Sequence, residues 1–282
     1  MPTLDQPLAY LNGQAVLPAQ LRPGLIEAAG GQILAERVID QGVAARLAQQ
    51  GLKIEPADIT AEQNILLQAL NPDPQQAQRL LNELRSLRGL GPTRYAAMLR
   101  RNAGLRLLVR DQAAPTEPAI RDEFQLEYGP RFEARIIVVD TLAKAGEMEK
   151  TLQAGVSFID LAIANSTDSS RAQGGLLPLI SPVDPLYPLA VREALGALKP
   201  GQISPPVALA GGFAVLKLEK KTEARPVRFD DVKKTLALHV RRRNERMLMQ
   251  QVVRDIINKA DLTILDPALD ASYAEHKKLL TQ

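Results

Sequence analysis

The residue types in this chain that could do chemistry gather in one polar loop. The loop runs from Asn165 to Leu177, carries Asp168 among Ser and Thr residues, and includes the pair Gly174-Gly175. A carboxylate in such a loop can act as a polar catalytic group, or it can cap a turn or a short helix. The Ser- and Thr-rich surroundings favour the capping role for Asp168.

The residue types that are absent exclude several kinds of catalysis. The chain has no Cys, which excludes disulfides, thiolate metal sites and a Cys nucleophile. Its two His residues, His239 and His276, lie far beyond the polar loop. The N-terminal half has no Gly-rich phosphate loop, no cluster of metal ligands and no Ser-His-Asp spacing. The sequence therefore implies no metal and no cofactor.

The elements that must position the loop are short and alternate in type. An apolar strand is expected over residues 134–139, followed by an amphipathic helix that ends near residues 155–162. After the loop come a Lys-Pro-Gly block at residues 197–207 and a last strand at residues 211–219.

In this order, the blocks between Phe132 and Glu219 resemble a parvulin-type peptidyl-prolyl isomerase domain. The resemblance implies four antiparallel strands, a few helices, and an apolar pocket that holds the proline ring. Such a domain accelerates rotation about the X–Pro bond, which has an uncatalysed barrier of roughly 18–20 kcal/mol.

The resemblance also assigns roles to single residues. Active parvulins carry two histidines on adjacent strands that hydrogen-bond to each other, and both positions are substituted here. The Cys or Asp that faces the peptide carbonyl corresponds to Asp168, which we expect to pair with Arg135 or Arg171. The His positions are Arg135 and Ala214, and the candidate substrate-binding residues are Leu177, Tyr187, Val191 and Phe213. Because both His residues lie outside this segment, the polar half of a parvulin site is missing.

The two ends of the chain are mainly helical in pattern. A strand pair or one bent strand is expected around Asn12-Gly13, and a series of amphipathic helices follows it. A long helix is expected from Phe229 to about Ala260, and a short strand over Leu262–Leu265. The order resembles the SurA and PrsA chaperones.

That resemblance implies an α+β fold. One helical domain comes from both chain ends, residues 1–129 and 222–282, with the parvulin-like domain, residues 130–221, inserted between them. We expect the strand Leu262–Leu265 to pair with the strand near residues 10–16. We also expect the long helix to pack on the helix that contains Ile33, Val38 and Leu47.

Charge and hydropathy limit the classes of partner that the chain is expected to bind. Lys and Arg number 35 against 32 Asp and Glu, so the formal net charge is only +3, and the basic run at residues 241–246 has no interleaved aromatics. This predicts no nucleic-acid partner. No run approaches a membrane span. Residues 1–5 lack a signal-peptide pattern, so the chain is either cytosolic or a processed form; the resemblance implies an exported protein of the periplasm or cell envelope.

The function expected from the sequence is that of a folding factor. We expect it to hold unfolded or proline-containing polypeptides, with weak or no isomerase activity. Two alternatives stay open. One is an active isomerase that uses Asp168 and the apolar pocket alone, and the other is a scaffold that binds one specific protein partner. The oligomeric state is not indicated by the sequence.

Overall fold

The computed structural model describes residues 6–281, and the chain forms two compact units. One contains Met1–Ala114 together with Arg242–Gln282, and the other is Pro115–Arg241. The first is helical and built from both ends of the chain, and the second contains a small antiparallel sheet, so the expected α+β class with an inserted domain is confirmed. The boundary residues 130 and 221 remain predictions, and residues 1–5 and 282 lie outside the described part.

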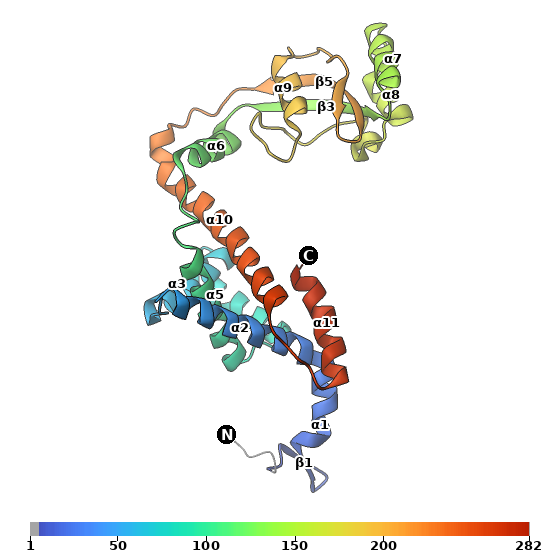
Figure 1. Ribbon diagram of the computed structural model, residues 1–282. Helices are drawn as coiled ribbons and strands as arrows, with labels where there is room; N and C mark the ends of the chain where they lie inside the picture. The colour runs from blue at the N-terminus through green and yellow to red at the C-terminus, as the bar shows by residue number, and fades with distance from the viewer. Residues whose placement is uncertain (1–5, 282) are drawn as a thin grey trace. The chain divides into compact units, whose positions relative to one another are not determined.

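The inserted unit is organised around a three-stranded antiparallel sheet of order β3-β5-β4 (Figure 1). The central strand β5 is Gly212–Thr222, and its neighbours are β3 (Arg131–Val139) and β4 (Val207–Leu209). Its helices are α6 (Glu117–Tyr128), α7 (Leu142–Gln153), α8 (Phe158–Asn165) and α9 (Leu189–Ala197).

Both faces of the sheet are covered by helices. On one face, Val191 and Leu195 of α9 pack against strand residues including Ile136 and Leu216. On the other face, side chains of α7 and α8 pack against residues that include Ile137 and Val215 of the strands. Because neighbouring strand residues point to opposite faces, β3 and β5 are apolar on both sides.

The outer edge of β3 is filled by an irregular segment rather than by a fourth strand. Ile136 donates its N–H to the carbonyl of Gly175 at 2.8 Å, and Phe132 and Ile180 exchange two backbone hydrogen bonds. Only isolated bridges form, so the sheet has three strands where the parvulin resemblance implied four. The glycine turn at Gly174 and Gly175, both with positive φ, interrupts any regular ladder.

The helical unit contains most of the remaining helices. The first two are joined by one π-helical stretch, Ile26–Gly30. Pro at the start of several helices supplies a preset φ where no intrahelical N–H bond is lost. The helices are α1 (Pro18–Leu25), α2 (Gly31–Gln49), α3 (Pro56–Leu70), α4 (Pro74–Leu87), α5 (Pro92–Val109), the part of α10 (Phe229–Lys259) from Arg242 onward, and α11 (Pro267–Thr281).

The end of the long helix α10 packs on α2, as predicted. Ile256 and Ile257 are buried in one core with Ile39, Val43 and other residues of α2 and α5. A Cβ on Gly42 would lie 2.4 Å from Ile256, so the two helices approach closely at this glycine.

The predicted pairing of residues 262–265 with the N-terminal strand is wrong. The strands β1 (Ala9–Leu11) and β2 (Gln14–Val16) pair with each other through a turn in which Asn12 and Gly13 have positive φ. Leu262 and Ile264 instead pack side chains against the α2 core.

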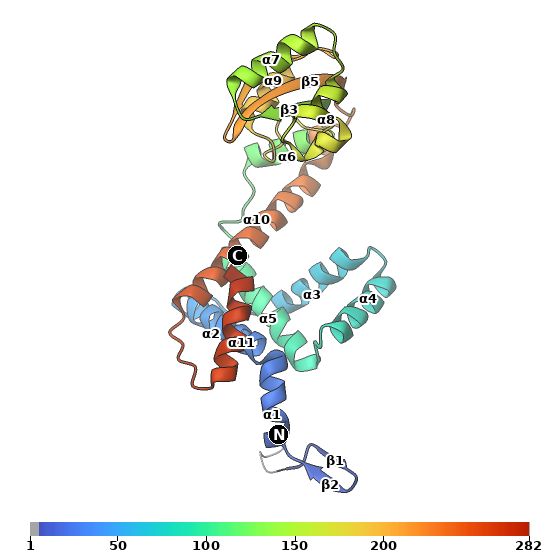
Figure 2. The ribbon, with the colours of Figure 1, turned by 90° about the vertical axis from the view of Figure 1, so that its right-hand side faces the viewer.

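The C-terminal helix α11 was not predicted. It lies beside α2 in both ribbon views (Figures 1 and 2), and its Tyr273 is buried in the α2 core. Its start carries a recognisable signal, because Asp266 accepts hydrogen bonds from the backbone of Ala268 and Leu269 just before the helix. Asp-Pro at the start of an apolar run therefore marks this helix.

Candidate functional site

Four of the predicted site residues gather on one face of the sheet. Ala214 and Val191 are buried in the core beneath α9, and Leu177 and Tyr187 are half-buried at its margin. Val191 is only 2% exposed, so it supports the surface from below and cannot line an open pocket. The accessible apolar groups at this margin are therefore Leu177 and Tyr187.

Asp168 is fixed beside this margin by the end of β3. Thr167 donates its N–H to the carbonyl of Val138 at 2.8 Å, and Val138 donates its own N–H to Oγ of the buried Ser166 at 3.1 Å. Asp168 Oδ1 accepts hydrogen bonds from the backbone N–H and hydroxyl of Ser170, at 2.8 and 2.5 Å. The carboxylate is thus the N-cap of a short 3₁₀ helix, Ser169–Gln173.

Tyr187 lies near this carboxylate and keeps its proton at neutral pH. Burial raises the pKa of the Tyr187 phenol, and the negative charges of Asp184 and Asp168 raise it further. A neutral phenol donates one hydrogen bond and also presents an apolar ring. The margin therefore combines apolar contact, one hydroxyl and the carboxylates of Asp168 and Asp184.

Arg135 lies on the opposite face of the sheet from Ala214. In the β3–β5 register Arg135 opposes Lys217, whereas Ala214 opposes Val138, three positions further along β3. Phe213 lies on the same face of the sheet as Arg135. It is partly buried in the core under α7 and α8. The implied grouping of positions 135 and 214 as one site, and of Phe213 with the proline pocket, is therefore wrong.

The expected pairing of Asp168 with an arginine is also wrong. Arg135 Nε donates to Glu219 at 3.0 Å, and its Nη1 donates to the carbonyls of Gln173 and Gly174. Arg171 Nε donates to the carbonyl of Ile163 at 2.6 Å. Carbonyls at a helix end and a glycine turn take the guanidinium donors instead. Arg135 thus clamps the turn that carries Leu177.

Sequence reasoning missed the two residues that hold the clamp and the loop. Glu219 is the carboxylate partner of Arg135, and Ser166 anchors the loop to β3. The sequence carries a signal for Glu219. It lies two residues after Lys217 in a predicted strand, so the two side chains are expected on the same face of the sheet. Ser166 has none, because its burial depends on how the loop returns to β3.

Replacing Gly175 by Ala is expected to lower the free energy of unfolding by about 2–4 kcal/mol, because two penalties add. Gly175 has φ +74°, and a Cβ there would lie 2.2 Å from the backbone oxygen of Ile136. The measurement is the urea midpoint of the full chain followed by circular dichroism.

Gly155→Ala is the matched control, because Gly155 also has positive φ, +93°, but has no atom within 4 Å of its Cβ position. It is expected to cost about 1 kcal/mol, from the backbone conformation alone. Equal losses in the two variants would contradict the close approach of the Gly175 turn to β3.

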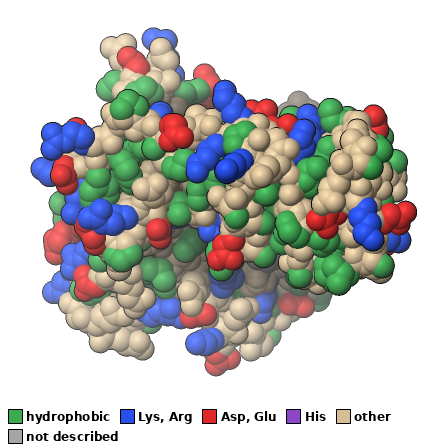
Figure 3. Space-filling model, turned by 90° about the horizontal axis from the view of Figure 1, so that it is seen from above, with side chains coloured by type: hydrophobic (Ala, Val, Ile, Leu, Met, Phe, Trp, Pro, Cys, Tyr) green, Lys and Arg blue, Asp and Glu red, His purple; other side chains and the backbone are tan. Residues whose placement is uncertain are grey.

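Charges of both signs are mixed on one face of the molecule. On the face shown in Figure 3, Lys and Arg side chains are interspersed with Asp, Glu and hydrophobic side chains. Across residues 6–281, no three His, Cys, Asp or Glu side chains are arranged to hold a metal ion. None of the helices in that range combines the length and apolar content needed to cross a bilayer.

The comparisons with known proteins agree on the inserted unit. Residues 115–234 match the family model described as the PPIC-type PPIASE domain. The chain is 31% identical over 166 residues to the foldase protein PrsA of Bacillus subtilis, which covers 58% of this chain and 55% of that protein. It is 29% identical over 168 residues to foldase protein PrsA 4 of Bacillus cereus, with 59% and 58% covered.

The chain spans about half the length of these curated relatives. A crystal structure of the peptidylprolyl isomerase PrsA from Bacillus cereus is similar over 97% of this chain and 99% of that chain, with 21% identity and a TM-score of 0.46. By sequence, this chain is thus similar to the PrsA foldases, and its middle part matches the model of the PPIC, or parvulin, type of peptidyl-prolyl isomerase domain.

Proposed function

We propose that this chain is a PrsA- and SurA-like folding factor that holds unfolded polypeptides and has little isomerase activity. The observation that carries the proposal is the state of the inserted domain. Its apolar margin is kept at Leu177 and Tyr187, while the two histidine positions are Arg135 and Ala214 on opposite faces of the sheet. A fold that keeps its apolar surface and loses its polar centre is suited to binding rather than catalysis.

An exposed apolar arm supports the binding of unfolded chains. The N-terminal arm, residues 8–25, comprises the β1–β2 hairpin and α1, and none of its residues is buried. Tyr10 is 72% exposed and Leu11 is 66% exposed. An isolated hairpin with large apolar side chains in water gains free energy by contacting other apolar surface. Unfolded polypeptides offer such surface without a fixed shape.

Replacing Tyr10 and Leu11 together by Ser is expected to weaken the suppression of aggregation about thirtyfold or more, since each loses about 1 kcal/mol or more of apolar contact with the client. The measurement is light scattering of a chemically unfolded model protein diluted into increasing amounts of the chain.

The melting temperature is expected to stay within a few degrees, because neither side chain is buried. Leu186→Ser is the control, since Leu186 is 86% exposed in the other unit. If the wild-type chain does not suppress aggregation, the folding-factor proposal is refuted. If both variants lose suppression equally, the N-terminal arm is not the surface that binds clients.

We also propose that the protein acts outside the cytoplasm, on the strength of its similarity to the PrsA foldases. Fractionation of cells that express the natural gene tests this, and recovery only with cytosolic markers would contradict it.

A further inference from the structure

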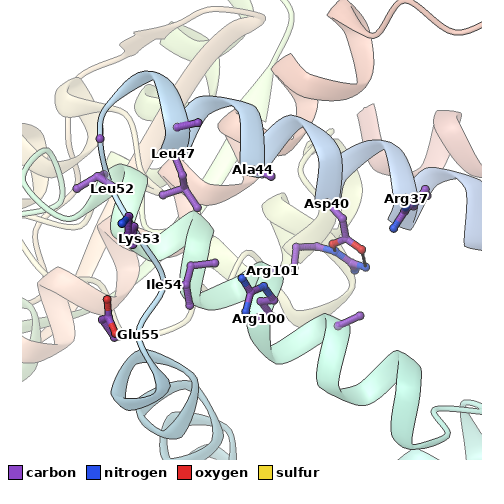
Figure 4. A pocket seen from close by; sticks show the side chains of 13 residues that line it. Arg37, Asp40, Ala44, Leu47, Leu52, Lys53, Ile54, Glu55, Arg100 and Arg101 are labelled. Atoms are coloured by element: carbon purple, nitrogen blue, oxygen red, sulfur yellow. Dashed lines mark hydrogen bonds and ion pairs between the residues drawn. The ribbon is translucent and has the colours of Figure 1, made fainter.

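The helical unit contains a groove that the folding-factor proposal does not use. It lies between α2, the turn at residues 50–55 and α5, and has a volume of about 740 Å³ (Figure 4). That volume falls within the range of small-ligand sites, roughly 300–1,000 Å³, and fits one or two side chains of a bound segment. Its floor is apolar and is made by Ala44, Leu47, Leu52, Ile54 and Ala97.

The floor is held firmly by the core beneath it. Leu47 is 5% exposed in the core of α2, and Leu52 and Ile54 pack against that core half-buried. A Cβ on Gly104 of α5 would lie 2.6 Å from Val43 and 3.1 Å from Ile54, so the helices and the turn are in close contact. The groove is therefore preformed, and a ligand meets a fixed apolar surface.

The rim of the groove is positively charged. Arg101 is neutralised by Asp40 at 2.6 Å and by Glu36 at 3.7 Å. Four lining residues are cationic and two are acidic, which leaves an excess of two positive charges.

The excess charge is available to a ligand. Arg37, Lys53 and Arg100 are all exposed and take part in none of the ion pairs or side-chain hydrogen bonds found among residues 6–281. Figure 4 shows Lys53 and Arg100 on either side of Ile54, and Arg37 further along α2 beyond Asp40. Glu55 supplies the one acidic lining side chain without an ion pair in the same range.

The combination of an apolar floor and a cationic rim selects one class of ligand. The lining has no aromatic side chain on which a base could stack, which disfavours single-stranded nucleic acid. We propose that the groove binds an extended polypeptide segment in which an aliphatic side chain is flanked by Asp or Glu. The aliphatic group fills the floor, and the flanking carboxylates meet Arg37, Lys53 and Arg100. This rests on the proposed function, since the segment is part of an unfolded client.

The test uses three fluorescently labelled peptides and the full chain. The first has a Leu between Asp residues, the second has the same Leu between Lys residues, and the third keeps the Asp residues but has Gly for Leu. Anisotropy titration is expected to show at least about tenfold tighter binding of the first peptide than of either other one. Added salt is expected to weaken that binding, because the rim is exposed to solvent.

The variant Lys53→Glu/Arg100→Glu reverses two rim charges without touching the floor. It is expected to weaken binding of the Asp-flanked peptide about tenfold or more and to improve binding of the Lys-flanked peptide. Arg79→Glu/Arg88→Glu is the matched control, because both arginines are exposed on or next to α4 and the net charge changes equally. The control is expected to bind like the wild type.

The outcomes separate this site from the proposed function. Equal binding of the three peptides, or equal loss in both double variants, would overturn the groove proposal while suppression of aggregation stands. Equal binding of the Asp peptides with and without Leu would show a simple anion site and would also overturn it. Selective peptide binding by a chain that never suppresses aggregation would keep the groove and refute the folding factor.

Discussion

Replacing Arg106 by Met is expected to lower the free energy of unfolding of the helical unit by about 3 kcal/mol or more. Arg106 lies on α5 and forms ion pairs with Glu62 of α3 and Glu245 of α10, and both carboxylates are about 5% exposed. Removal of the guanidinium leaves Glu62 buried without its cation. The cost of an uncompensated buried charge exceeds the gain from a well-packed Met side chain.

The ion pairs make Arg106 permanently cationic in the folded chain. Burial opposes its charge, but hydrogen bonds and charges from Glu62 and Glu245 outweigh burial and raise the pKa of Arg106 above its ordinary value. Its contribution to stability is therefore retained through the neutral and alkaline range.

Urea unfolding at pH 7 and at pH 9 measures this effect. Arg110→Met is the control at the end of the same helix, because Arg110 is 55% exposed and its ion pair with Asp111 spans 3.7 Å in solvent. The control is expected to change stability by less than about 1 kcal/mol. An Arg106→Met loss no larger than that of the control, or one that disappears at pH 9, would contradict a buried ion-pair cluster.

The helices were largely predictable from local sequence. Apolar spacing of three to four residues and Pro or capping residues at their starts predict α2 to α6 and α10, and these signals act within one helix. The strand partner of residues 10–16 was not predictable from local sequence. A hairpin at Asn12-Gly13 and a distant strand can both satisfy the same backbone N–H and C=O groups. Only the packing of Leu262 and Ile264 on the α2 core decides between them.

Sequence reasoning grouped the apolar candidate residues together, and their role in binding stays a prediction. Leu177, Tyr187, Val191 and Ala214 were predicted at a common site, and they share one face of the sheet. The side to which Arg135 points depends on the β3–β5 register, and a shift of one residue reverses every side chain. The observed register places Arg135 opposite Lys217. No local sequence pattern encodes that pairing.

The charged groove lay beyond sequence reasoning for a related reason. Arg37, Lys53 and Arg100 are separated by tens of residues, and none belongs to a charge run or a recognisable motif. They meet because α5 returns against α2 and the turn at residues 50–55 closes one end. Long-range helix packing, which single-sequence patterns do not specify, creates the site.

The full chain is expected to accelerate a proline-limited refolding reaction by no more than about twofold. The uncatalysed reaction takes tens to hundreds of seconds. A parvulin site needs polar groups that face the twisted amide. Here the polar groups beside the apolar margin include the neutral phenol of Tyr187 and the carboxylates of Asp168 and Asp184. Asp168 Oδ1 already accepts two hydrogen bonds from Ser170, and Asp184 Oδ1 accepts one from the backbone N–H of Leu186. A carboxylate engaged as a cap is poorly placed to act on a peptide carbonyl.

Asp168→Ala and Asp168→Asn separate the capping role from a catalytic one. We expect neither substitution to change the refolding rate. Asp168→Ala is expected to lower the free energy of unfolding by about 1 kcal/mol, because the cap is lost. Asp168→Asn keeps an acceptor oxygen and is expected to retain most of that stability. Refolding followed by fluorescence at catalytic amounts of chain measures the rate, and urea unfolding measures the stability. Strong acceleration by the wild type that both substitutions abolish would show an active isomerase that relies on the Asp168 carboxylate. It would contradict the proposal that the folding factor has little isomerase activity.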